Sequence, residues 1–98
     1  MQGNQKPIRE GFAIFIPTLC QGIIPAYHDE TERPIVFSTE LEAQREIADD
    51  QVTRIQQFLD GEREFDDAIN TDEFVLPVEV WPDGNISTED GKIYGKTN

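Results

Sequence analysis

The strongest periodic pattern lies between Thr39 and Gly61, where apolar residues recur every three or four positions. The repeat consists of Ala43, Ile47, Ala48, Val52, Ile55, Phe58 and Leu59. This spacing predicts a helix with one apolar stripe facing a core. Thr39 and Glu42 have the spacing of a capping box, and Asp60 followed by Gly61 is typical of a helix end. A helix of about 21 residues would be roughly 31 Å long.

Short runs rich in β-forming residues flank this helix and predict strands. They lie at Phe12–Ile16, Gly22–His28, Ile35–Ser38 and Glu73–Trp81. In the last run, Phe74, Leu76, Val78 and Val80 alternate with Val75, Pro77, Glu79 and Trp81, which predicts one buried and one exposed face. Pro25 and Pro77 cannot donate to a strand ladder, so we expect an edge or a bulge at each.

A second, shorter helix is expected at 63–70, with Phe65, Ala68 and Ile69 facing inward. Two Asp-Gly pairs, at 83–84 and 90–91, predict small hairpins in the tail. The resulting order is β-β-β-α-β-β. It indicates an α+β protein, with an antiparallel sheet and one long amphipathic helix packed on one face in two layers.

Length and composition set the scale of the fold. The 98 residues, 37% of them hydrophobic, predict one domain over 1–98, with 1–10 as a flexible leader. No run approaches the ~20 apolar residues of a membrane span. The polar start of the chain does not have the form of a signal peptide. With one cysteine, Cys20, these features favour a cytoplasmic protein.

The charge is strongly lopsided. The net charge is −12; residues 1–38 carry four acids and three bases, whereas residues 39–98 carry sixteen acids and five bases. Nucleic-acid recognition relies on Lys and Arg neutralising phosphates, so direct nucleic-acid binding is disfavoured. Anionic membranes are disfavoured for the same reason. A basic protein partner, or mere solubility, is what the charge favours.

Four acids on the predicted helix, Glu42, Glu46, Asp49 and Asp50, are spaced to form a stripe opposite the apolar stripe. Neighbours three or four positions apart have Cβ atoms about 5–6 Å apart, close to the spacing of phosphates along a strand. Either the stripe is a solvated face, which is the commoner case, or it mimics a nucleic acid. Salt adaptation is a third interpretation. Glu62, Glu64, Asp66 and Asp67 would extend the same surface.

Catalytic and metal-binding patterns are weak. Cys20 and His28 are the only residues of their kinds, and nothing in the sequence places them together; we expect Cys20 to be a small buried hydrophobe. Alternating oxygen ligands from Asp83 to Glu89 resemble a calcium loop, but its glycine and bidentate-glutamate positions hold Thr88 and Tyr94. We therefore predict no catalytic, cofactor-binding or metal-binding residues.

Trp81 lies on the outward face of its predicted strand. A tryptophan in that place can anchor a partner. The favoured interpretation is that it covers the rim of a small core, because a domain this small has little other bulk for that purpose.

The stretch "VFSTELEAQREI" (36–47) resembles the strand-to-helix entry of short uncharacterised bacterial and phage proteins. In size and charge the chain is similar to phage-encoded inhibitors such as anti-CRISPR and other DNA-mimic proteins. The resemblance implies an inhibitor or regulator that occupies a basic, nucleic-acid-binding groove, and it transfers no functional residue. We predict a non-enzymatic protein-binding module that contacts a basic protein. The alternative is a homodimerising structural module, joined through a sheet edge or the Trp81 face.

Overall fold

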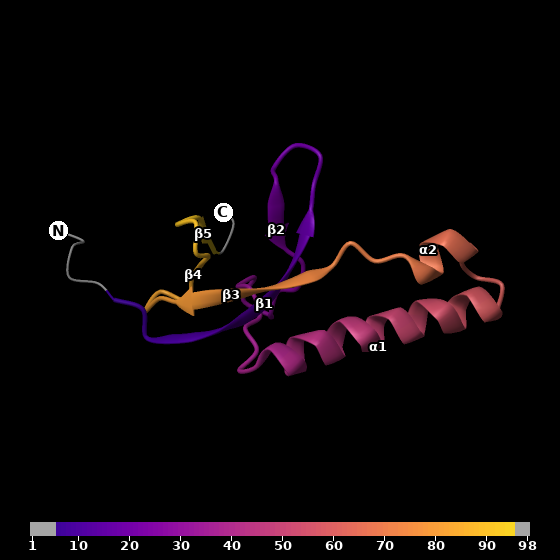
Figure 1. Cartoon of the computed structure of the whole chain (residues 1–98), viewed down its shortest axis with the longest axis horizontal. Helices are drawn as coiled ribbons and strands as arrows, with labels where there is room; N and C mark the ends of the chain where they lie inside the picture. Colours follow the sequence, from indigo (N-terminus) through magenta and orange to yellow (C-terminus); the bar gives the residue numbers. More distant parts are fainter. Residues whose placement is uncertain (1–5, 96–98) are drawn as a thin grey trace.

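The computed structural model describes residues 6–95. Its elements are β1 (Arg9–Pro17), β2 (Ile23–Pro25), α1 (Glu40–Leu59), α2 (Phe65–Ile69), β3 (Phe74–Val80), β4 (Ile86–Ser87) and β5 (Ile93–Tyr94). The strands form one antiparallel sheet in the order β2-β1-β3-β4-β5. The long helix α1 runs along β1 and β3 (Figure 1). The α+β class is confirmed, although the order is β-β-α-α-β-β-β.

The sheet is built around the pairing of β1 with β3, which runs in register from Arg9↔Val80 to Phe15↔Phe74. One face of this pair forms the core, where Ala13, Phe15, Val78, Val80 and Ile86 are buried. The ring of Phe15 lies 5.3 Å from that of Tyr94. Phe74 and Leu76 pack against the same cluster. The predicted buried face of β3 is therefore confirmed, whereas on the other face only Pro77 and Glu79 are exposed and Val75 and Trp81 are half-buried.

The strand predicted at 35–38 is reduced to one bridge. Phe37 and Phe12 exchange two backbone hydrogen bonds of 2.8 and 2.7 Å. β2 already occupies the same edge of β1 further along, opposite Phe15–Pro17, and the cap of α1 begins at Thr39. Between β2 and the start of α1, only the pair Phe12 and Phe37 therefore has room to form a bridge. Gly11 permits this close approach, since a Cβ there would meet Val36 and lie 2.8 Å from the Phe37 carbonyl oxygen.

The two prolines are accommodated where the ladder is open. Pro25 lies in β2, which is an edge strand as predicted. Pro77 lies in β3, between β1 and β4, opposite Phe12. Because Phe12 directs both its backbone groups at Phe37, the nitrogen of Pro77 points away from β1. On that side β4 pairs only with Glu79 and Val80, so no ladder bond is lost.

Several local predictions are confirmed. Thr39 and Glu42 form the capping box, and Gly61 has the left-handed φ of 82° expected after a helix end. The two Asp-Gly turns lead into β4 and β5, with φ of 87° at Gly84 and 88° at Gly91. β1 begins at Arg9, so it includes the last two residues of the predicted leader; residues 1–5 lie outside the described part.

The fold is elongated, with principal extents of 55 × 29 × 25 Å. Its radius of gyration is 15.5 Å, against about 13 Å for a compact chain of this length. The second half of α1 and the short α2 extend beyond the sheet and produce this shape (Figure 1). Between residues 6 and 95, neither helix has the length and apolar character needed to cross a membrane.

The capping box should measurably stabilise α1. In Thr39→Ala the Glu42 N–H loses its acceptor, the Thr39 hydroxyl oxygen at 3.1 Å. We expect the free energy of unfolding to fall by about 1 kcal/mol, measured by urea denaturation. The matched control is Ser38→Ala, which removes a neighbouring exposed hydroxyl and should change stability by less than about 0.5 kcal/mol. Equal effects of the two changes would contradict this role for Thr39.

Candidate protein-binding surface

The rotation of α1 about its own axis decides which side chains reach solvent. Ala43 is fully buried against the sheet, and Ile47 is half-buried. The prediction of a single inward apolar stripe is wrong beyond this point. Val52 is 64% exposed and Leu59 is 67% exposed. Along one side of α1 the exposed apolar residues are Leu41, Ala48, Val52, Ile55 and Leu59, and we call them the outer ridge. Phe58 is also 37% exposed, but it packs against Phe65.

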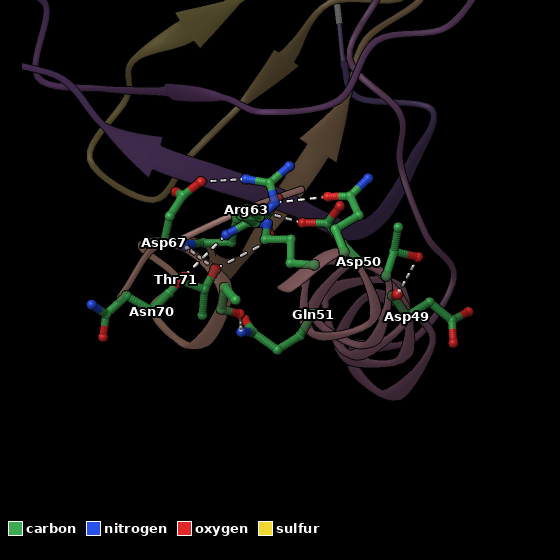
Figure 2. Close-up of polar contacts among 12 residues, drawn as sticks. Asp49, Asp50, Gln51, Arg63, Asp67, Asn70 and Thr71 are labelled. Atoms are coloured by element: carbon green, nitrogen blue, oxygen red, sulfur yellow. Dashed lines mark hydrogen bonds and ion pairs between the residues drawn. The ribbon is translucent and has the colours of Figure 1, made fainter. Parts of the chain in front are cut away.

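The inner side of the second half of α1 is polar. Arg54 makes an ion pair of 2.6 Å with Asp50 and lies 3.9 Å from Glu73 at the start of β3. Its guanidinium also donates a 3.0 Å hydrogen bond to the carbonyl of Asn70. Gln51 donates to the carbonyl of Ala68 (Figure 2). These bonds join α1 to the segment that follows it, with polar groups facing inward. The outer ridge therefore faces solvent.

The short helix α2 contributes less to the core than predicted. Ala68 is fully buried, but Phe65 is 53% exposed and Ile69 is 47% exposed, so their predicted inward orientation is wrong. A five-residue helix presents only about one and a half turns, and here one small residue fills the contact. Phe65 packs edge-on against Phe58 at 5.2 Å. Arg63 makes an ion pair with Asp67 and donates a 2.7 Å hydrogen bond to the side-chain oxygen of Gln57 (Figure 2).

An open groove of about 540 Å³ lies where α1, the α2 segment and the end of β1 meet. It is lined by Ile16, Pro17, Ala26, Arg54, Asp66, Asp67, Asn70, Asp72 and Glu73. Within residues 6–95, four carboxylates and one guanidinium thus line the groove, and apolar side chains form part of the wall. We call this the acidic groove. Its composition suits a cationic side chain with an apolar stem.

The predicted site acids are distributed unevenly over this region. Asp66 and Asp67 line the acidic groove. Asp50 is bound to Arg54, and Glu42 accepts hydrogen bonds from the backbone of Ser38 and Thr39. The other four acids are not brought into the groove: Glu46 is half-buried on α1, and Asp49, Glu62 and Glu64 are exposed.

Two groove acids, Asp72 and Glu73, were not among the predicted site residues. They follow α2 and precede β3, and the tertiary fold turns them back toward Arg54. The only local signal was their proximity in sequence to Asp66 and Asp67. Tertiary structure brings these two residues to the groove, and no periodic pattern in the sequence indicates that position.

Trp81 is half-buried, and its indole N–H donates a 2.8 Å hydrogen bond to the hydroxyl of Ser87. Ser87 itself is only 7% exposed. A buried polar ring atom with a satisfied partner is typical of a structural tryptophan. This arrangement favours the interpretation that Trp81 covers the rim of the core.

Tyr27 lies beside the polar contacts of α1. Burial, then a hydrogen bond to Glu73 and the negative charges of Glu73, Asp50 and Glu46, raise the pKa of Tyr27 well above its usual value of 10.0. Every one of these causes disfavours the phenolate. Tyr27 therefore belongs to the polar cluster that joins α1 to β3.

A second open groove, of about 670 Å³, lies on the sheet near the start of α1 and is also acidic. Glu10, Glu79 and Glu89 line it, and Glu10 stands directly opposite Glu79 across the strands. Like charges facing each other across a strand pair are unfavourable. We call this the sheet groove; among residues 6–95, no arginine or lysine lines it.

Other chemistry has little support in the part of the chain that the structure describes. Within residues 6–95, no three His, Cys, Asp or Glu side chains are arranged to hold a metal ion. Cys20 is exposed in the turn between β1 and β2, so its predicted burial is wrong; a tight hairpin turn has no core to enter. A scan against protein-family models and searches of curated proteins and of solved structures gave no match.

Removing Arg54 should loosen α1 from the sheet. In Arg54→Met the side chain of Glu73, which is 8% exposed, keeps its charge without its ion-pair partner. We expect a loss of about 2 kcal/mol in the free energy of unfolding, below the ~3–5 kcal/mol of a fully buried pair because Arg54 is partly exposed. Adding Glu73→Gln to Arg54→Met should recover part of that loss. Strictly additive effects in chemical denaturation would show that the pair is uncoupled.

Raising the pH should destabilise the fold through Tyr27. The pKa of Tyr27 is raised in the folded protein. Its contribution to the free energy of unfolding is therefore fully present below pH 10.0, the usual pKa of tyrosine, and is lost as the pH rises through the pKa of the folded state. The unfolded chain then releases the tyrosine proton first. Tyr27→Phe should show a shallower alkaline decline in the urea midpoint. Parallel declines for the two proteins would contradict the burial of a protonated Tyr27.

Proposed function

We propose that this chain is a non-enzymatic protein-binding module that receives a basic segment of another protein in its acidic groove. The observation that carries the proposal is the gathering of Asp66, Asp67, Asp72 and Glu73 around one open groove whose lining, within residues 6–95, holds one arginine. Arg54 is occupied by Asp50, Glu73 and the Asn70 carbonyl, and Asp67 is paired with Arg63. The negative excess that the groove keeps for a ligand therefore comes from Asp66 and Asp72.

The groove fits a lysine or arginine side chain of the partner in two ways. The apolar wall of Ile16, Pro17 and Ala26 can cover the aliphatic stem, as such stems are covered elsewhere. The charged end then meets carboxylates. At 4 Å, one such contact contributes about 1 kcal/mol in water and about 4 kcal/mol near a protein surface. Several partly solvated contacts together give an affinity that depends strongly on salt.

The exposed acids of α1 would extend the contact beyond the groove. Asp49 and the half-buried Glu46 lie on the helix flank next to Asp50. In the stronger form of the proposal, these carboxylates take the place of phosphates in a nucleic-acid-binding surface of the partner. The chain would then act as a small inhibitor or regulator, of the kind found among phage and bacterial accessory proteins. The proposal places it in the cytoplasm, without direct nucleic-acid binding.

The alternative of a homodimerising module has a different physical basis. The sheet edges provide little for it, since β2 has three residues and β5 has two. Trp81 is engaged with Ser87. The observation that favours self-association is instead the exposed outer ridge of α1.

The groove can be tested with a fluorescent lysine- and arginine-rich peptide as the probe. Asp66→Asn with Asp72→Asn alters two groove carboxylates for which the structure shows no side-chain hydrogen bond or ion pair within residues 6–95. We expect the peptide to bind about threefold to tenfold more weakly, measured by fluorescence anisotropy at low salt. High salt should weaken binding to the unaltered chain.

The matched control changes the same number of charges in the sheet groove, as Glu79→Gln with Glu89→Gln. This variant has the same net charge as the Asp66→Asn, Asp72→Asn variant. If the acidic groove is the binding site, the control should bind nearly as tightly as the unaltered chain. Equal weakening by both variants would mean that only the total charge matters, and would overturn the assignment of the groove.

A further inference from the structure

The outer ridge has the spacing of a coiled-coil seam. Positions 41, 45, 48, 52, 55 and 59 are separated alternately by four and three residues, and five of the six are apolar. At 3.6 residues per turn they fall within a stripe roughly 80° wide, centred nearly opposite the buried Ala43. This alternation is the pattern by which one helix packs along another.

The ridge is uncovered over its whole length. Leu41, Val52, Ile55 and Leu59 are 56%, 64%, 39% and 67% exposed. Among the helices and strands of residues 6–95, Figure 1 shows none on the side of α1 away from the sheet. The apolar side chains of the ridge, interrupted only at Arg45, line up along one side of the helix, and an exposed apolar patch rimmed by polar residues can mark an interaction site. Neither the acidic groove nor the sheet groove makes use of it.

We propose that two copies of this chain associate through their outer ridges, with the two α1 helices antiparallel. In that arrangement Leu41 faces the partner's Leu59, Arg45 faces the partner's Ile55, and Ala48 faces the partner's Val52. The ridge is thus complementary to itself. The small Ala48 allows close approach at the centre. The stem of Arg45 can lie over the partner's Ile55 while its guanidinium reaches water.

The distribution of charge also suits a second copy. Glu46 and Asp50 lie on the inner side of α1, half-buried, so they remain away from the seam. Of the acids of α1, Glu42 and Asp49 are the two that flank the seam between the paired helices. Glu42 would lie near the partner's Gln56. The one like-charge contact pairs Asp49 with the partner's Asp49, close to the symmetry axis.

The size of the ridge sets the strength of the dimer. Eighteen residue steps at 1.5 Å give a strip about 27 Å long and about 10 Å wide. That is well below the ~800 Å² that each partner buries in a standard interface. We therefore expect a weak, exchanging dimer that forms only at high protein concentration, with a dissociation constant approaching about 1 mM. Two copies of an acidic chain repel, so added salt should tighten the dimer, whereas it should weaken binding to a basic partner.

Sedimentation equilibrium as a function of protein concentration tests the dimer. Val52→Gln with Leu59→Gln should raise the dissociation constant at least tenfold. The matched control, Thr53→Gln, changes an exposed residue of the same helix outside the ridge and should leave it unchanged. Arg45→Leu completes the seam and should tighten the dimer, so the proposal does not depend on loss of function alone. Asp49→Asn should tighten it as well.

Cysteine cross-linking in a Cys20→Ser background tests the direction of the helices. Leu41→Cys mixed with Leu59→Cys should form disulfide-linked dimers, whereas Leu41→Cys alone should not. A chain that stays monomeric up to about 1 mM would overturn the proposal, as would a dimer unaffected by Val52→Gln with Leu59→Gln. Self-linking of Leu41→Cys would overturn the antiparallel arrangement. Salt should strengthen the dimer and weaken peptide binding in the acidic groove. A negative result for the dimer can therefore be distinguished from a negative result for peptide binding.

Discussion

The rotation of α1 about its axis is the constraint on which both candidate surfaces depend. At one end the helix is set by Ala43, whose small side chain lies fully buried against the sheet. At the other end it is set by Arg54, which joins Asp50, Glu73 and the Asn70 carbonyl. With polar groups holding the inner side, the apolar residues of the second half face solvent. The acidic groove and the outer ridge both follow from this one setting.

The β1–β3 pair supplies the rigid base for that arrangement. It joins residues from the two ends of the chain over seven matched positions and buries one continuous apolar face. The other face of the pair supports the first half of α1. The ladder between β1 and β3 ends at Phe15 and Phe74, and the second half of the helix extends beyond the sheet (Figure 1). The polar contacts around Arg54 therefore replace apolar packing there.

The two surfaces of α1 differ in physical character, and this separates the roles proposed for them. Binding in the acidic groove would depend on charge in partly solvated surroundings and would weaken with salt. Association through the outer ridge would bury apolar area and would be opposed by the net charge of −12. A dimer through the ridge would carry two acidic grooves at once. Two grooves on one particle would strengthen binding to a partner with repeated basic segments without any new contact.

Local sequence determined the elements whose signals are local. The capping box of Thr39 and Glu42, the stop at Gly61, the Asp-Gly turns and the buried face of β3 all appear where their patterns predict. The α+β class follows from these elements. Asp66 and Asp67 could be named as site residues because they extend a visible run of acids, but nothing local marked Asp72 and Glu73 as their neighbours.

Only the tertiary structure decided which way the helix faces. The apolar residues of α1 cover two angular sectors, and the sequence permits either to be buried. Arg54 selects the sector of Ala43 and Ile47 by reaching Asn70 and Glu73, which lie 16 and 19 positions further along the chain. The strand predicted at 35–38 is a single bridge for a similar reason, since β2 pairs with the same edge of β1. Helical periodicity fixes the spacing of side chains, whereas the choice of buried face depends on distant contacts that periodicity does not encode.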